Sequence, residues 1–191
     1  IKYIMVTQTN SRFRIKVNST EINKDSGFYA IISSGSSALC LPNDEYIVSG
    51  MTIAKLNERK IDVAGCYIIP LGNNVIDIIY FGIFNLWIFT TQFFYPNASG
   101  GGIFCRKTIH KKVNGFDETI KLSEDMNYVK RCSNYGKFRI LNNAKTHISV
   151  RRFEREGRLK LGAKLFLSVV YRLFFGEIRS DIFKYNLRYR K

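Results

Sequence analysis

The stretch from Ser99 to Asp125 constrains the fold more than any other part of the chain. It opens with three glycines at 100–102, continues as an apolar run at 103–105 and a basic segment, and ends on Glu124-Asp125. A turn-like Asn-Gly-Phe-Asp-Glu separates the basic segment from the acidic pair. The pattern predicts a glycine loop, a strand, a short helix, a turn and a second helix.

The acidic pair is expected at the start of that second helix. Ser123 is a predicted N-cap, so Glu124 and Asp125 would lie in the first turn, where free N–H groups and the helix dipole favour negative charge. We therefore expect both carboxylates to keep a low pKa and to stay ionised at neutral pH. Such a group suits a base or a cation contact at the edge of a pocket.

The motifs of this stretch, taken together, resemble the acceptor-side half of a family 2 glycosyltransferase catalytic domain. The matching residues are Gly101-Gly102, Arg106, Gly115-Phe116-Asp117-Glu118 and Glu124-Asp125, while Asn114 stands where the family usually has a glycine. A later segment, Ser149-Val-Arg-Arg-Phe153 followed by Gly157-Arg158, is similar to a membrane-associated branch of that family. The resemblance covers roughly residues 41–159.

The resemblance implies an α/β fold of the GT-A type, with a mixed sheet flanked by helices, incomplete at its N-terminus and followed by a C-terminal amphipathic helix. It places a glycosyltransferase-like domain at 1–155, of which 1–40 would be a diverged donor-side part. Residues 156–191 are expected to form a basic amphipathic tail. The implied activity is inverting transfer of a sugar from a nucleotide-sugar donor to an acceptor hydroxyl, in the synthesis of cell-surface glycans or glycolipids.

The resemblance also assigns roles to individual residues. Asp125 would be the catalytic base, while Glu124 and Asp117 would orient the acceptor. The expected contacts to donor or acceptor are Gly101, Gly102, Arg151 and Arg152, and the candidate ligand for a divalent cation (Mn or Mg) is His147. From the residues alone, Asp125 could equally be a helix-terminal carboxylate, and a lone histidine on a strand is usually structural.

Two alternative functions stay open. The family places an Asp-x-Asp metal motif after the strand at 28–32, but this chain has Ser33-Ser34-Gly35-Ser36-Ser37 there, with no carboxylate before Asp44. That departure supports a truncated or inactive relative that acts as a binding module. Asp44 and Glu45, at the start of the predicted helix that follows, could be donor contacts or simple helix-dipole complements. The net charge of +15 admits a basic nucleic-acid-binding protein, although no recognition motif accompanies it.

The charge and two apolar segments favour an anionic membrane surface as a partner. Residues 75–95 are nearly long enough to span a bilayer, but Asp77, Asn85 and Gln92 recur on one helical face. An interfacial helix and a buried core helix are both compatible with this pattern. The tail from 151 to 191 carries 12 Lys/Arg against 4 Asp/Glu, and its run at 161–175 predicts a helix lying on anionic lipid.

The remaining expectations concern local structure. The four cysteines show no paired spacing, which predicts reduced core residues and a cytoplasmic protein held peripherally on the membrane. We expect His110 on the solvated surface and Gly136 at a helix C-terminus that closes a helix at 124–135. Predicted strands are 1–6, 13–17, 28–32, 63–70, 137–141 and 146–150, with a turn at 142–145 and a helix beginning near 41–47.

Overall fold

The computed structural model describes the backbone of residues 4–5, 28–32 and 56–183, and the side chains of 56–141 and 145–183. Several predictions lie outside these residues: the strand at 13–17, the serine loop at 33–37 and the helix near 41–47, with Cys40, Asp44 and Glu45.

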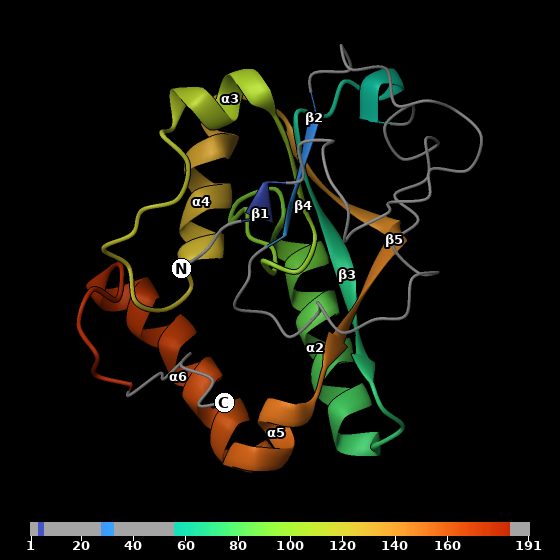
Figure 1. Cartoon of the computed structure of the whole chain (residues 1–191), viewed down its shortest axis with the longest axis vertical. Helices are drawn as coiled ribbons and strands as arrows, with labels where there is room; N and C mark the ends of the chain where they lie inside the picture. Colours follow the sequence, from blue (N-terminus) through green and yellow to red (C-terminus); the bar gives the residue numbers. More distant parts are fainter. Residues whose placement is uncertain (1–3, 6–27, 33–55, 184–191) are drawn as a thin grey trace.

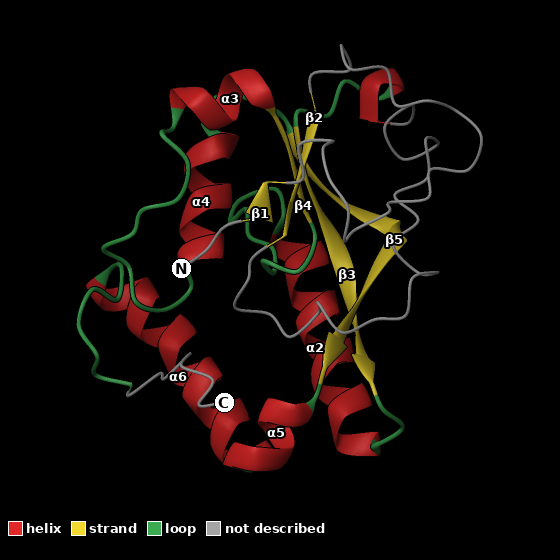
Figure 2. Ribbon diagram, viewed as in Figure 1, coloured by secondary structure: helices red, strands yellow, loops and turns green. Residues whose placement is uncertain are grey.

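A five-stranded mixed sheet forms the centre of the molecule, with the order β1-β2-β4-β3-β5 (Figure 2). Its strands are β1 (Ile4–Met5), β2 (Phe28–Ile32), β3 (Val63–Leu71), β4 (Ile103–Arg106) and β5 (Phe138–Ser149). Strand β4 is antiparallel to both of its neighbours, whereas β3 and β5 run parallel. The predicted mixed α/β architecture is thus confirmed.

Strand β5 corrects one prediction. The sequence suggested two short strands joined by a turn at 142–145, but a single strand runs through this segment. Both halves pair with the nine-residue β3, first as Cys66↔Leu141 and then, after a shift of register, as Tyr67↔Lys145. Residues 142–144 of β5 are the extra residues at this register shift, and they form a bulge opposite β3. Because pairing with β3 resumes directly after the bulge, the chain continues as a strand and does not turn.

Five helices with described bounds accompany the sheet (Figure 1), and residues 56–58 add a helical segment before β3. The five helices are α2 (Val75–Thr91), α3 (Lys107–Lys112), α4 (Glu124–Ser133), α5 (Arg151–Glu156) and α6 (Arg158–Phe175). Helix α4 ends two residues earlier than predicted, with Asn134 as its C-cap. Gly136 permits close packing at this point, because a Cβ atom there would lie 2.6 Å from the side chains of both Asp62 and Ile109.

The main core lies between the sheet and helices α2, α3 and α4. Its buried members from the helices include Ile88, Ile109 and Tyr128, which pack with Val63 and Phe138 of the sheet. A second, smaller cluster covers the opposite face of the sheet, where Ala64, Cys66 and Phe104 meet Leu56. The prediction of reduced core cysteines is confirmed for the three that are described, Cys66, Cys105 and Cys132.

Helix α2 directs its polar side chains inward. Asn85 exchanges two hydrogen bonds with the backbone of Ile68, and the Gln92 side chain accepts one from the Ile140 N–H. Asp77 is completely buried. The predicted polar face therefore exists, but it faces the sheet and α6. Most of the helix's large apolar residues are exposed instead: Val75, Ile76, Ile78, Ile79, Ile83, Leu86 and Phe89.

No helix among the described residues combines the length and the apolar character that crossing a bilayer requires.

Candidate functional site

The glycine turn and the acidic pair meet, although 25 residues separate them in sequence. The backbone N–H of Gly100 donates a hydrogen bond of 2.6 Å to Asp125 Oδ2. The other carboxylate oxygen of Asp125 accepts from the N–H of Met126 at 2.8 Å. Asp125 is thereby held at the N-terminus of α4 by donors from two separate elements.

The prediction that Glu124 and Asp125 both have a low pKa is wrong. Burial raises the pKa of Glu124 to about 7, and the charge of neighbouring Asp125 adds to the shift. Burial also raises the pKa of Asp125, against the opposing effect of its hydrogen bonds and of the Arg172 charge. For both carboxyl groups, burial raises the pKa by more than the predicted position at a helix N-terminus would lower it.

Ser123 precedes α4, as predicted, but does not cap it with its side chain. Its backbone is left-handed, at φ 63° and ψ 36°, and its hydroxyl makes no capping hydrogen bond. A side chain attached to backbone in this conformation does not point at the free N–H groups of the first turn, as an N-cap in the β region would.

The predicted turn at 114–118 is present and is fastened to α4. Asn114 and Gly115 both have positive φ, and the Arg131 guanidinium donates to the carbonyls of Val113 and Gly115. Phe116 stacks on Tyr128 with ring centroids 4.2 Å apart. This packing fixes the position of the turn relative to α4.

Asp117, expected to orient an acceptor, lies in a local network of its own. It accepts hydrogen bonds from both the N–H and the hydroxyl of Thr119, and it pairs with Arg179 at 3.1 Å. These hydrogen bonds from Thr119, with a further contribution from Arg179, lower the pKa of Asp117. Asp117 is therefore ionised at neutral pH in the folded protein.

Gly101 and Gly102 lie against β5. A Cβ atom at Gly102 would be 2.5 Å from Thr146 Oγ1, and one at Gly101 would be 3.2 Å from Ile148 Cδ1. The glycines therefore permit close packing of the turn on the strand. Because side chains alternate along a strand, His147 points to the opposite face from Thr146 and Ile148. The structure therefore brings Asp125 to the glycine turn, whereas His147 is not on the face of β5 against which the glycines pack.

Arg151 and Arg152 begin α5, directly after β5. The Nε of Arg152 lies 2.7 Å from Glu156, and the Nε of Arg151 donates to the Ser149 hydroxyl. Within the described residues, no hydrogen bond joins either arginine to Asp125. Arg106, another residue of the motif block, forms a 2.6 Å ion pair with Asp62 at the start of β3.

Two contributors to the site were not predicted. One is the N–H of Gly100, and the other is Arg172 of α6, whose charge acts on Asp125. Arg172 is buried, pairs with Glu177 at 2.9 Å and donates to the Met126 sulfur. The sequence signal that could have predicted the role of Arg172 is its position within the apolar run at 161–175, because an arginine that is buried there requires polar or charged partners.

His110 is not the solvated residue that the sequence suggested. It is partly buried, and its Nδ1 lies 2.8 Å from the Tyr128 hydroxyl. Burial, with a contribution from nearby Arg131, lowers its pKa. His110 therefore helps to join α3 to α4.

Within the described ranges, no three His, Cys, Asp or Glu side chains gather closely enough to hold a metal ion. Comparison with protein-family models, with curated proteins and with solved structures finds no match to this chain.

Proposed function

We propose that the protein is a glycosyltransferase of the GT-A type, which transfers a sugar from a nucleotide-sugar donor to an acceptor hydroxyl with inversion. The contact between Gly100 and Asp125 carries this proposal, because it joins the two parts of the motif block. The mixed sheet, with β4 antiparallel between two neighbours, is compatible with such a fold.

Asp125 is the proposed base. Inverting transfer requires a carboxylate that takes the proton of the acceptor hydroxyl as the anomeric carbon is attacked, and such a base works best with a pKa near the working pH. The raised pKa of Asp125 moves it in that direction. Glu124, with its pKa near 7, lies beside it and is proposed to orient the acceptor, as is Asp117.

Arg151 and Arg152 are proposed to face the donor diphosphate, since a guanidinium can bind phosphate oxygens through two parallel hydrogen bonds. A divalent cation would share this task, with His147 as a candidate ligand. Because the described side chains do not form a metal-binding group, none of the proposed steps depends on the cation.

The test combines calorimetric titration and a transfer assay on the full chain. We expect UDP or GDP to bind, with or without manganese, and Arg152→Ala to weaken that binding by about tenfold or more because a phosphate contact is lost. Arg155→Ala is the matched control, since Arg155 is a highly exposed arginine on the same short helix. Asp125→Asn should keep nucleotide binding but lower the transfer rate by about 100-fold to 10,000-fold.

Absence of nucleotide binding under every condition would overturn the proposal and favour the inactive binding module. Binding to nucleic acid without any binding to nucleotide-sugar would favour the basic nucleic-acid-binding alternative instead.

A further inference from the structure

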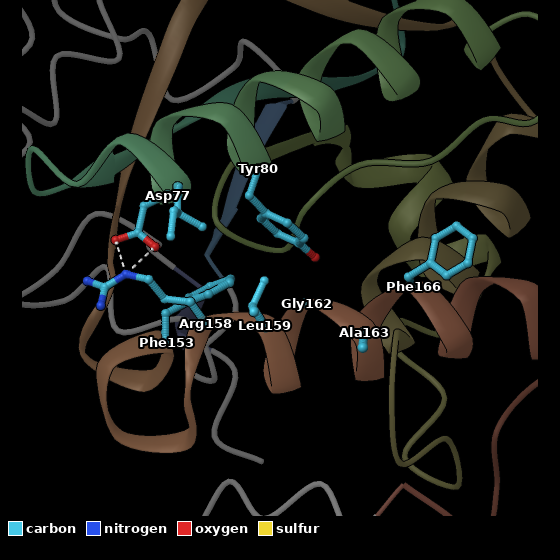
Figure 3. Close-up of a pocket in the computed structure, with 9 residues that line it drawn as sticks. Asp77, Tyr80, Phe153, Arg158, Leu159, Gly162, Ala163 and Phe166 are labelled. Carbon is cyan, nitrogen blue, oxygen red and sulfur yellow. Dashed lines mark hydrogen bonds and ion pairs between the residues drawn. The ribbon is translucent and has the colours of Figure 1, made fainter.

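A groove lies between the N-terminal halves of α2 and α6 (Figure 3), and neither Asp125 nor the glycine turn is among the residues that line it. Its volume is about 260 Å³. It is bordered by Ile76 and Tyr80 of α2, Phe153 of α5, and Leu159, Gly162 and Phe166 of α6. Small-molecule pockets in proteins usually measure about 300–1,000 Å³, so this groove suits a slender ligand and not a nucleotide-sugar.

The groove has an apolar lining with one neutralised charge pair. Asp77 is completely buried, and both of its carboxylate oxygens accept from Arg158 Nε, at 3.0 and 3.1 Å. Figure 3 shows this pair at one end of the groove, with Phe166 at the other. Since Asp77 and Arg158 satisfy each other, the site offers mainly apolar surface, which favours a hydrocarbon over a polar ligand.

Small residues keep the groove open. Gly162 faces Tyr80, whose ring would lie 3.4 Å from a Cβ atom at that position, and Ala163 follows it on α6. A larger side chain at 162 would occupy the space between the two helices. The free volume therefore depends on this glycine.

The groove opens onto exposed apolar surface from both helices. Ile76, Leu159 and Phe166 line it and are 50%, 81% and 67% exposed, respectively. On α2, such residues continue along the outer face to Phe93 and Phe94 beyond its C-terminus, and on α6 they continue to Phe174 and Phe175. Many exposed apolar side chains on the two helices that border a groove are typical of an interaction site rather than of a free surface.

The positive charge of α5 and α6 indicates which kind of partner covers the groove. Helices α5 and α6 together carry seven Lys/Arg against two Glu, and of these basic residues Arg151, Arg155 and Lys160 are exposed; the whole chain carries +15. Basic residues beside exposed apolar helix faces match a bilayer leaflet that contains anionic lipid. A lysine or arginine can bury its methylene stem in such a surface while its charge stays at the headgroups.

We propose that α2 and α6 dock on the surface of an anionic bilayer, and that one acyl chain of a leaflet lipid enters the groove beside Asp77 and Arg158. Tyr80 and Phe153 form its inner wall, and Gly162 provides the space. The inference does not depend on sugar transfer, because none of the groove residues belongs to the proposed catalytic site.

The test uses the full chain with vesicles of phosphatidylcholine, with and without phosphatidylglycerol. A trace of phosphatidylglycerol carries a photoreactive diazirine on one acyl chain, and mass spectrometry maps the cross-links. We expect binding that requires phosphatidylglycerol, with cross-links on residues 76–80 and 158–166.

Two glycine variants give the matched comparison. Gly162→Leu should lower the groove cross-links by about tenfold, because its side chain fills the space that the lipid chain would occupy. Gly82→Leu adds the same side chain in the interior of α2, where a Cβ atom would point into open space, and should leave the groove cross-links unchanged. Far-UV circular dichroism verifies that both variants fold.

Several results would overturn the inference. These are equal binding to neutral and anionic vesicles, cross-links confined to the aromatic ends at 93–94 and 174–175, or no vesicle binding at all. A stable dimer in sedimentation without vesicle binding would assign the apolar faces to a second copy of the chain instead.

Discussion

At the scale of single residues, Glu124 differs most from what its sequence position suggests. Helix N-termini ordinarily favour ionised carboxylates, but burial and the neighbouring Asp125 raise the pKa of Glu124 from 4.5 to about 7. Between these two pH values the folded protein holds a proton that the unfolded chain has released. The free energy of unfolding therefore falls as the pH rises through this interval.

Replacing Glu124 by glutamine should remove this pH-dependent cost. We expect Glu124→Gln to gain about 1–3 kcal/mol in unfolding free energy relative to the original chain between pH 5 and pH 8. Urea denaturation at the two pH values measures the difference. Glu118→Gln is the control, since Glu118 is exposed in the preceding turn. Parallel pH profiles for Glu124→Gln and the original chain would contradict the assigned pKa.

At the scale of elements, local sequence pattern predicted those features that neighbouring residues determine. The strand at 63–70, the helix within 75–95 and the turn at 114–118 are all present. The pattern failed where distant partners decide the structure: β5 continues through 142–145 because it pairs with β3. The raised pKa of Glu124 likewise depends on enclosure by the folded chain, which no local motif reveals.

The candidate site was predicted only in part for the same reason. The Glu124-Asp125 pair and the glycine turn could be recognised from sequence, and the structure brings them into contact. The inward orientation of the polar face of α2 could not be predicted, because helical periodicity identifies a face without showing what it packs against. Asp77, Asn85 and Gln92 find their partners only in the folded sheet and in α6.

The ion pair between α2 and α6 gives a prediction at the element scale. Arg158→Ala leaves the Asp77 carboxylate buried without its charge partner, so we expect a loss of about 3 kcal/mol in unfolding free energy. Arg155→Ala, at an exposed arginine on the adjacent helix, should change it by no more than about 0.5 kcal/mol. Chemical denaturation of both variants provides the measurement.

A double variant separates the effect of an unpaired charge from that of lost packing. Asp77→Leu combined with Arg158→Leu should recover most of the stability lost in Arg158→Ala, because apolar pairs often replace a buried ion pair at little cost. If Arg158→Ala were no more destabilising than Arg155→Ala, the pair would have no measurable role in joining the helices.

At the scale of the whole molecule, the described part of the predicted tail, residues 156–183, packs onto the rest of the described structure. Leu161 is buried with Phe81 and Phe153, and Arg172 is buried beside Met126. Farther along, Ile178 forms an isolated β-bridge with Leu122, next to the start of α4. These contacts attach α6 near both of its ends, to α2 and α5 at its N-terminal end and to α4 at its C-terminal end.

Such packing predicts that α6 unfolds together with the sheet. Trp87, the single tryptophan, lies on α2 and reports on the main core. A second reporter, Tyr171→Trp in a Trp87→Phe background, places the fluorophore on α6, where Tyr171 contacts Phe175. We expect the two urea transitions to coincide with each other and with the loss of far-UV circular dichroism, as in a two-state transition. Unfolding of α6 at a distinctly lower urea concentration would mean that residues 156–191 form a separate unit, with a boundary near 155.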